Sequence, residues 1–597
     1  MRSQPSVRTY EELCTEAKAR IREVQPRELF LELGAKAQIG ESPVVIDVRE
    51  PEEYHADRLP GASSLPRGLV EKGIPQVVSP DQPFVVYCQT GKRSALVADV
   101  LQGMGYTGVR SLGGGIESWL AAGLPTDRGG AAALGAVEER PPVDHADWTS
   151  IRADYGITSR MVTTADGLEK PLVYLDHAAS THPPSTVVAA YARFLEHEYA
   201  NVHRATYALA RAATDRYEAA FRTCAEFVGG NLTSGCVVFT SNTTHGCDLV
   251  AHCTQHLPGR VLVTDLEHHS NDLPFRKRGE VVRARITSEG RLDLDHVEAL
   301  LKREQIKLLA VCGAANVTGW MPPLRRLARM AHEHGALIAV DAAQLVAHVP
   351  IDVRANDPGE SIDFLITAGH KAYAPFGIGF VYAKRALLDA AEPYLPGGGT
   401  AVSVTEDGAV FLGSPDRHQG GTPNIAGAIA YAEMLRYLSA IGMARVREHE
   451  LELMRIAWPA LQQMSGITLY GPDALQERVG IITFNIDGVN DMLAAAVLGE
   501  EFGIAVRNGR FCAHVHAANL MRNQGGFTAS GDAPPSAVRA SFGLYNNRHD
   551  VDRLLDAIRA VRDRRWKGNY RLREGGMVSD RQWGGRCADA WMEGDPA

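Results

Sequence analysis

The sequence has few cysteines, no long apolar run and no excess of positive charge. Its nine cysteines in 597 residues show no paired spacing, which favours reduced thiols over a disulfide framework. The absence of a Cys-x-x-Cys pair or a histidine-rich cluster predicts no metal site. No stretch approaches the roughly eighteen apolar residues of a membrane span, and the N-terminal residues lack the apolar core of a signal peptide.

Acidic residues outnumber basic ones, and the formal net charge is -9. A chain of this charge, without a polybasic segment, is not expected to use nucleic acid or an acidic membrane as its main partner. We therefore expect a cytoplasmic protein with no membrane partner and no direct nucleic-acid partner.

The length of the chain predicts several structural units, because a single core rarely serves more than about 300 residues. Beyond residue 170, short Val, Ile and Leu strands alternate with helical patterns, which is typical of a mostly parallel sheet covered by helices. The expected strands are 237–240, 260–264, 307–312, 337–340 and 363–366. We predict an α/β chain with an N-terminal helical extension (1–24), a parallel-sheet domain (25–127), a linker (128–150), a large α/β domain (151–425), a small α+β domain (426–565) and an irregular tail (566–597).

A cysteine lies between a strand pattern at 84–87 and a helical pattern from Ser94. The loop reads Cys88, Gln89, Thr90, Gly91, Lys92 and Arg93. Amides that point into such a loop stabilise an anion, so we expect Cys88 to be a thiolate near neutrality, with Lys92 and Arg93 adding to the positive field. Four residues lie between Cys88 and Arg93, one fewer than between the cysteine and arginine of phosphatases of similar design, and the tighter loop suits one sulfur atom.

Together with residues 46–54, 59–62 and 112–116, this loop resembles a single-domain rhodanese over most of residues 25–127. The resemblance implies a parallel-sheet fold in which Cys88 carries sulfur. An alternative is a module that only docks a sulfur acceptor or acts as a sensor.

Lys371 and Asp341 indicate a second site, because each follows a strand pattern. A lysine that attaches pyridoxal phosphate needs a strand end to hold it, and the pyridine nitrogen of that cofactor needs a carboxylate to keep it protonated. The pair therefore predicts a site for pyridoxal 5'-phosphate.

Segments 174–181, 240–246, 266–271, 315–319 and 421–424 follow in the order typical of class V aminotransferase-fold enzymes, of fold type I. Over roughly residues 150–565 the chain resembles SufS-type cysteine desulfurases most. The resemblance places the backbone of Ala178 near the substrate. It places Thr243, Thr244 and His370 at the cofactor phosphate, and Asn316 and Gln344 near the phenolic oxygen. His268 would lie on the pyridine ring, where it also moves protons. It places Thr422 in a loop that reaches the phosphate of a partner subunit, which implies a homodimer.

The segment 506–514 resembles the desulfurase loop that holds the nucleophilic Cys512. That thiol attacks the sulfur of L-cysteine after Lys371 has removed the α-hydrogen, which leaves alanine and a persulfide. Arg539 is placed for a bidentate grip on the substrate carboxylate, with Arg507 as a second contact. Asn316 is expected to contact substrate as well as cofactor.

The two sites together predict that sulfur passes from L-cysteine to Cys512, then to Cys88, and on to an acceptor protein. A tether raises the effective concentration of the second thiol. Another class V activity, selenocysteine lyase or a carbon-sulfur lyase, stays open as an alternative. The remaining cysteines carry no motif, although Cys587 lies in a tail that can in principle relay sulfur.

Overall fold

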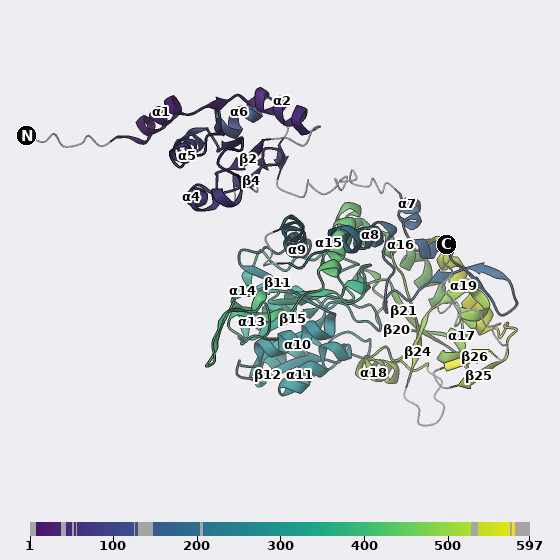
Figure 1. Ribbon diagram of the computed structural model, residues 1–597. Coiled ribbons are helices and arrows are strands. Elements are labelled where there is room, and N and C mark those ends of the chain that lie inside the picture. The colour runs from purple at the N-terminus through teal and green to yellow at the C-terminus, as the bar shows by residue number, and fades with distance from the viewer. Residues whose placement is uncertain are drawn as a thin grey trace, which may run out of the picture. The chain divides into compact units, whose positions relative to one another are not determined.

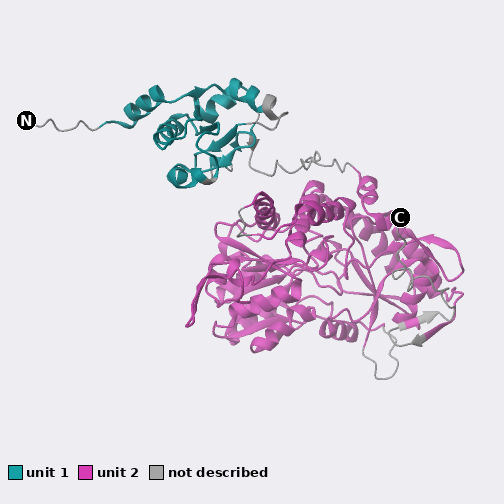
Figure 2. Cartoon of the chain, in the orientation of Figure 1, with its two compact units in different colours: residues 1–140 teal, residues 141–597 magenta. Residues whose placement is uncertain are grey.

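The computed structural model describes residues 8–37, 43–50, 53–54, 57–124, 126–128, 147–202, 207–526, 535–573 and 576–579. The chain divides into two compact units, residues 1–140 and 141–597 (Figure 2). Each unit has its own sheet and its own buried core. Within the described ranges, no helix has both the length and the apolar character that crossing a membrane requires.

The first unit is a five-stranded parallel sheet with helices on both faces (Figure 1). In spatial order the strands are β1 (Glu23–Val24), β6 (Val109–Leu112), β5 (Phe84–Tyr87), β2 (Val44–Asp47) and β4 (Ser63–Ser64). Its helices include α1 (Tyr10–Arg20), α2 (Pro26–Ala37), α4 (Val70–Gly73), α5 (Lys92–Gly103) and α6 (Gly115–Ala121).

Strand β5 sends alternate side chains into two separate cores, as a strand buried on both faces must. Phe84 and Val86 pack with residues of α4 and α5, whereas Val85 and Tyr87 pack with residues of α2 and α6. The next residue in this alternation is Cys88, which belongs to the α5 side of the sheet.

The segment expected as a separate N-terminal extension, residues 1–24, is in part an element of this sheet. β1 pairs with β6, and α1 packs on α5 through an ion pair of 2.7 Å between Arg20 and Asp99. At the other end, β7 (Asp127–Arg128) pairs with β3 (Asp57–Arg58), so the first residue of the expected linker still belongs to this unit. Residues 129–146 lie outside the described residues.

The second unit contains a seven-stranded sheet that is parallel except for β17, which confirms the predicted α/β architecture. In spatial order the strands are β11 (Gly235–Thr240), β17 (Gly379–Lys384), β16 (Phe364–Ile366), β15 (Leu337–Asp341), β14 (Ile306–Cys312), β12 (Arg260–Thr264) and β13 (Val281–Ala284). All five expected strands are present, and β13 and β17 are additional. Helices that cover the sheet include α8 (Ser185–Arg193), α9 (Ala208–Phe227), α10 (Thr243–Thr254), α11 (Leu273–Arg278), α12 (Leu294–Arg303), α13 (Leu324–Glu333) and α15 (Ile425–Ile441).

A smaller antiparallel sheet follows, in the order β20 (Ile467–Tyr470), β21 (Ile481–Ile486), β24 (Ala537–Ser541) and β23 (Arg507–Gly509). It packs with α16 (Met443–Gln462), α17 (Asp491–Phe502) and α19 (Arg548–Arg562), while α18 (His514–Gln524) follows β23. α15 packs in the core of the large sheet, so that core continues beyond residue 425. Strand β10 (Val173–Tyr174) pairs with β22 (Ile504–Ala505), so the start of this unit is tied to the small domain.

The expected irregular tail contains a pair of antiparallel strands, β25 (Tyr570–Arg573) and β26 (Gly576–Ser579). Glu501 anchors the chain before it by accepting hydrogen bonds from the backbone amides of Lys567 and Gly568 and from the Tyr570 hydroxyl. The sequence pattern missed this strand pair because its anchor is a distant carboxylate and not a local apolar period. Residues 580–597, including Cys587, lie outside the described residues.

Candidate functional site

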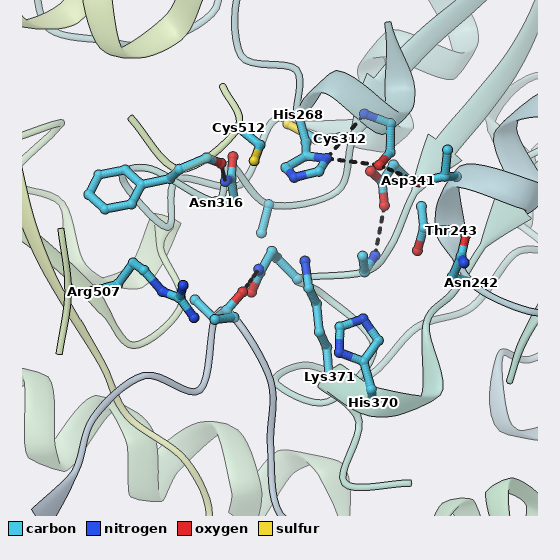
Figure 3. A pocket seen from close by; sticks show the side chains of 18 of the residues that line it. Asn242, Thr243, His268, Cys312, Asn316, Asp341, His370, Lys371, Arg507 and Cys512 are labelled. Atoms are coloured by element: carbon cyan, nitrogen blue, oxygen red, sulfur yellow. Dashed lines mark hydrogen bonds between the residues drawn. The ribbon is translucent and has the colours of Figure 1, made fainter. Parts of the chain in front are cut away.

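A cavity of about 390 Å³ opens where the parallel strands of the large sheet end (Figure 3). Ligands bind at this edge in open α/β sheets, because loops from several strands converge there. Of the residues predicted for this site, the cavity is lined by Ala178, Thr243, Thr244, His268, Asn316, Asp341, Gln344, His370, Lys371, Arg507, Cys512 and Arg539. Thr422 is exposed and does not line the cavity.

Lys371 and Asp341 place an amine and a carboxylate in the same buried site. Lys371 ends a short 3-10 turn, η7 (Gly369–Lys371), and its side chain points into the cavity in Figure 3. Burial lowers the pKa of Lys371 to about 8, although the charge of Asp341 acts in the opposite direction. Burial also raises the pKa of Asp341, while the amide of Ala343, 2.9 Å from Oδ1, favours its ionised form. The site therefore combines a readily deprotonated amine with a carboxylate shielded from water.

The start of α10 forms an anion cradle on another wall of the cavity. Asn242 caps the helix by accepting a hydrogen bond of 3.0 Å from the amide of His245, and Thr243 and Thr244 are the first helical residues. Amides in a first helical turn lack helical acceptors and favour an anion. The Thr243 hydroxyl is buried without a hydrogen-bond partner among the described residues. Burial lowers the pKa of His370, which also lines the cavity, to about 4, so this ring is neutral near pH 7.

His268 has a fixed tautomer. Its Nδ1 accepts a hydrogen bond of 3.1 Å from the Ser270 amide and lies 3.0 Å from the Ser270 hydroxyl. The ring proton is therefore on Nε2. Burial lowers the pKa of His268 to about 3, and Lys371 contributes in the same direction. This imidazole stays neutral at physiological pH and can donate a hydrogen bond from Nε2.

Cys512 lies in an exposed loop that is held in an unfavourable backbone conformation. Phe511 and Cys512 have φ values of 54° and 52°, a region that costs a non-glycine residue about 1 kcal/mol or more. Two hydrogen bonds fix the loop: His269 donates its amide to the Cys512 carbonyl at 2.8 Å, and Asn316 donates Nδ2 to the Phe511 carbonyl at 2.7 Å. These contacts hold the thiol at the cavity that Lys371 enters (Figure 3).

The two predicted arginines share one carboxylate, that of Asp176. Arg507 donates from Nη2 to Asp176 at 2.8 Å, and its side chain is half-exposed. Arg539 is buried, its Nη2 is 3.7 Å from Asp176, and its Nη1 donates to the Asn316 carbonyl at 2.9 Å. Burial lowers the pKa of Arg539 to about 10. Its Nε has no hydrogen-bond partner among the described residues, so part of the guanidinium stays available to a ligand.

The sequence prediction missed several residues of this site. Ser270 orients His268, Asn242 caps α10, and Asp176 joins the two arginines. A helix-cap residue before Thr243 was a usable signal for Asn242, whereas nothing local pointed to Asp176. Cys312, one of the cysteines without a sequence motif, is buried and also lines the cavity.

In the first unit, the Cys88 loop connects the end of β5 to the start of α5. Cys88 is buried, and the amide of Ser94 donates a hydrogen bond of 3.4 Å to its sulfur. The amide of Ile116 binds the Cys88 carbonyl at 2.9 Å. This close approach requires Gly115, because a Cβ there would lie 2.3 Å from that carbonyl oxygen. Arg49 is also buried and donates to Gln89 at 3.0 Å.

The two cations of this loop do not act alone on Cys88, which modifies the sequence expectation. Lys92 forms an ion pair of 2.6 Å with Glu11, and Arg93 forms one of 2.6 Å with Glu53. Each positive charge is therefore opposed by a carboxylate that the loop sequence does not reveal.

Comparison with known proteins divides the chain in the same way as its fold. Residues 173–554 match the aminotransferase class-V family, and residues 32–122 match the rhodanese-like domain. A cysteine desulfurase from Haloferax volcanii is 37% identical over 443 residues, which are 72% of this chain and 99% of the relative. A cysteine desulfurase from Escherichia coli K12 is 35% identical over 421 residues, 69% of this chain and 97% of the relative.

Two solved structures have the same fold as the second unit. The apo structure of a cysteine desulfurase from Thermococcus onnurineus has a TM-score of 0.62 at 31% identity, with 70% of this chain and 98% of that one covered. The crystal structure of an S-sulfonic acid form of a cysteine desulfurase from Escherichia coli has a TM-score of 0.59 at 31% identity. The match covers 70% of this chain and 98% of that one. The chain belongs to the cysteine desulfurase family of class V aminotransferases, and it carries a rhodanese-like domain in the same polypeptide.

Proposed function

We propose that this chain is a pyridoxal phosphate-dependent cysteine desulfurase that moves sulfur from L-cysteine onto Cys512. The observation that carries the proposal is that Cys512 lines the same cavity as Lys371 and Asp341. A cofactor site alone is common to the whole class V family, whereas a thiol at its edge supplies the nucleophile that desulfuration needs. Relatives that are named cysteine desulfurases and align over almost their full length support the same conclusion.

The residues of the cavity fit pyridoxal phosphate, the cofactor of this family. The buried Thr243 hydroxyl and the buried Asn316 Oδ1 both lack a hydrogen-bond partner among the described residues, as expected of groups that bind a polar ligand. Lys371 would attach the cofactor, and Asp341 would bind its pyridine nitrogen. His268 would lie on the face of the ring, and Asn316 and Gln344 would bind the phenolic oxygen. The phosphate would be bound by Thr243, Thr244 and His370. When bound, the cofactor supplies an electron sink that acidifies the α-hydrogen of the substrate.

The protein groups then divide the work by position and charge. Arg539 binds the substrate carboxylate, Lys371 takes the α-hydrogen as a proton on Nζ, and the Cys512 sulfur attacks the sulfur of L-cysteine. A sulfur-sulfur bond forms at Cys512 while the carbon-sulfur bond of the substrate breaks. Lys371 returns its proton to the α-carbon, and a proton equivalent to that of the Cys512 thiol adds to the β-carbon to give L-alanine, so the step needs no external oxidant or reductant.

Mass spectrometry of the full chain after incubation with L-cysteine tests this proposal. Added sulfur on the Cys512 peptide with an equal amount of alanine, both lost in Cys512→Ser, is the expected result. Alanine formation that persists in Cys512→Ser would instead favour a carbon-sulfur lyase that releases sulfide. A large preference for selenocysteine over cysteine would favour a selenocysteine lyase.

The rhodanese-like domain supports a second step, in which the Cys512 persulfide passes its outer sulfur to Cys88 and then to an acceptor protein. Both thiols belong to one polypeptide, which raises their effective concentration when the connection between the units permits contact. Persulfide on the Cys88 peptide that depends on Cys512 is the expected result. If Cys88→Ser leaves sulfur delivery to every tested acceptor unchanged, the domain acts as a docking or sensor module.

Thr422 supports the proposal of a homodimer. It is exposed and absent from the cavity lining of one chain, as expected if its loop completes the phosphate site of a partner. Sedimentation of the full chain should give twice the mass of one chain. Thr422→Ala should weaken cofactor retention in that dimer, while a monomeric enzyme with full cofactor retention would overturn the proposal.

A further inference from the structure

Helix α1 adds a carboxylate to the rim of the Cys88 loop. The helix lies outside the stretch that matches the rhodanese-like domain, which begins at residue 32, and it packs along α5 (Figure 1). The Cys14 sulfur is 3.9 Å from the Lys92 carbonyl, and Glu11 forms its ion pair with the Lys92 amine. The packing of α1 therefore fixes Glu11 beside the last residues of the loop.

A second carboxylate opposes the other cation of the loop. Glu53 binds Arg93 through two hydrogen bonds, at 2.6 and 2.7 Å, which hold the guanidinium in one plane with the carboxylate. The hydrogen bond with Glu53 raises the pKa of Arg93, and the loop sulfur of Cys88 acts in the same direction. The charge of Arg93 is thus compensated before any ligand arrives.

Another cation near the loop, Arg49, is also paired with carboxylates. Arg49 is buried and paired with Asp47 at 2.9 Å and with Asp57 at 3.2 Å. Gln89 donates a hydrogen bond of 3.2 Å to Glu117, which adds a further carboxylate near the loop. Arg49, Lys92 and Arg93 are thus each opposed by at least one carboxylate.

Because the positive charges of the loop are paired with carboxylates, the site should react differently with sulfur donors of different charge. Thiosulfate is a dianion and needs an uncompensated positive field to approach a thiolate, whereas a persulfide on a thiol carries at most one charge on its reacting end. We propose that Glu11 and Glu53 make the Cys88 site selective for sulfur carried as a persulfide on a thiol, and against thiosulfate. The inference rests on the proposed sulfur-carrier role of Cys88.

The transfer itself is balanced for both donors. The Cys88 thiolate attacks the outer sulfur of the donor persulfide, a sulfur-sulfur bond forms at Cys88, and the donor leaves as a thiolate that takes up a proton. With thiosulfate the same bond forms and sulfite leaves. Neither reaction needs a further oxidant or reductant. The two leaving groups differ, so the effect of charge on the site is measured by the carboxylate substitutions and by the salt dependence.

The test uses the full chain with Cys512→Ser, so that Cys88 receives sulfur only from the added donor. Sodium thiosulfate and the persulfide of N-acetylcysteine methyl ester are compared by the rate at which the Cys88 peptide gains one sulfur. We expect the persulfide to react at least about tenfold faster than thiosulfate. Glu11→Gln and Glu53→Gln should each raise the thiosulfate rate by about threefold at low ionic strength and leave the persulfide rate unchanged.

Glu16→Gln is the matched control, because Glu16 lies on the same helix but pairs with Arg8 and Arg20. Equal rates with both donors, or equal effects of Glu11→Gln and Glu16→Gln, would overturn the selectivity. A measurement without substitution gives an independent check, since salt screens repulsion and should raise the thiosulfate rate; a rate that falls with salt also overturns the inference. If Cys88 is reduced yet gains sulfur from neither donor, the carrier role itself is refuted.

Discussion

Asn316 donates a hydrogen bond of 2.7 Å from its side-chain amide to the carbonyl oxygen of Phe511, the residue before Cys512. The backbone carbonyl of Asn316 accepts a hydrogen bond of 2.9 Å from Arg539. One residue in the wall of the cavity therefore contacts both the thiol loop and the arginine proposed to bind the substrate carboxylate. The position of the nucleophile and the position of the substrate anchor are coupled through it.

Replacing Asn316 with alanine should release the thiol loop. The strained backbone at Phe511 and Cys512 then keeps one anchor, the amide of His269, and the loop samples other conformations. We expect persulfide formation to fall by about tenfold or more, as for a nucleophile that loses its orientation. Single-turnover alanine formation measures this effect, and Asn316→Asp is a useful comparison because it keeps the size but removes the donor. An unchanged rate in Asn316→Ala would show that the hydrogen bond does not position the thiol.

Arg539→Lys should raise the KM for L-cysteine by about tenfold or more, because a lysine cannot reproduce a bidentate grip on a carboxylate. The matched variant Arg507→Lys should have a smaller effect, since Arg507 is half-exposed and already paired with Asp176. Steady-state alanine production gives KM and kcat for both variants. Equal changes in KM would contradict the assignment of Arg539 as the principal carboxylate contact.

The lowered pKa of Lys371 predicts how cofactor attachment depends on pH. Only the uncharged amine reacts with an aldehyde, and burial lowers the pKa of Lys371 to about 8 from its usual value. In the protein stripped of cofactor, the rate at which the cofactor attaches should therefore rise with pH. At pH 7 the rate should be about tenfold lower than its maximum, and it should level off above about pH 8. The absorbance change after cofactor addition follows this rate, with Lys371→Ala as the blank. A rate that climbs steadily towards pH 10 would indicate an amine with an ordinary pKa.

Arg49→Lys should destabilise the first unit without touching the cavity of the second. The Arg49 guanidinium is buried and binds Asp47, Asp57 and Gln89, a set of contacts that a lysine cannot make together. We expect a loss of about 3 kcal/mol in the free energy of unfolding of this unit, because a buried carboxylate is left without its partner. Hydrogen exchange of its sheet peptides in the full chain measures the change. Arg20→Lys is the control, since its exposed pair with Asp99 should be worth less than about 1 kcal/mol.

Much of the fold follows from local patterns in the sequence. Strands such as 260–264 and 337–340 are buried apolar runs between turn residues, and the structure places β12 and β15 there. The strand-loop-helix order around Cys88 and the strand end before Lys371 are likewise encoded by neighbouring residues. The strands β13 and β17 were not predicted, and neither was the pair of β25 and β26, whose Tyr570 binds the distant Glu501.

The residues of the sites likewise include some that the sequence predicted and some that it did not. Motif order identified Lys371, Asp341, His268 and Cys512, and the structure brings all four to one cavity. Their roles, and the assignment to the SufS-type branch, stay predictions. Motifs name residues that lie close together in sequence, so they gave no sign that Asp176 contacts Arg507 across 331 positions.

The sequence by itself determined the two families of fold and the groups that can carry sulfur, because backbone patterns and loop motifs depend on adjacent residues. Only the tertiary structure decided which charges those groups experience. The ion pair of Glu11 with Lys92 joins residues 81 positions apart. Burial lowers the pKa values of Lys371 and His268, and the residues that bury them come from many segments of the chain. Electrostatic interactions act through space, so they depend on the packing that folding creates and not on order along the chain.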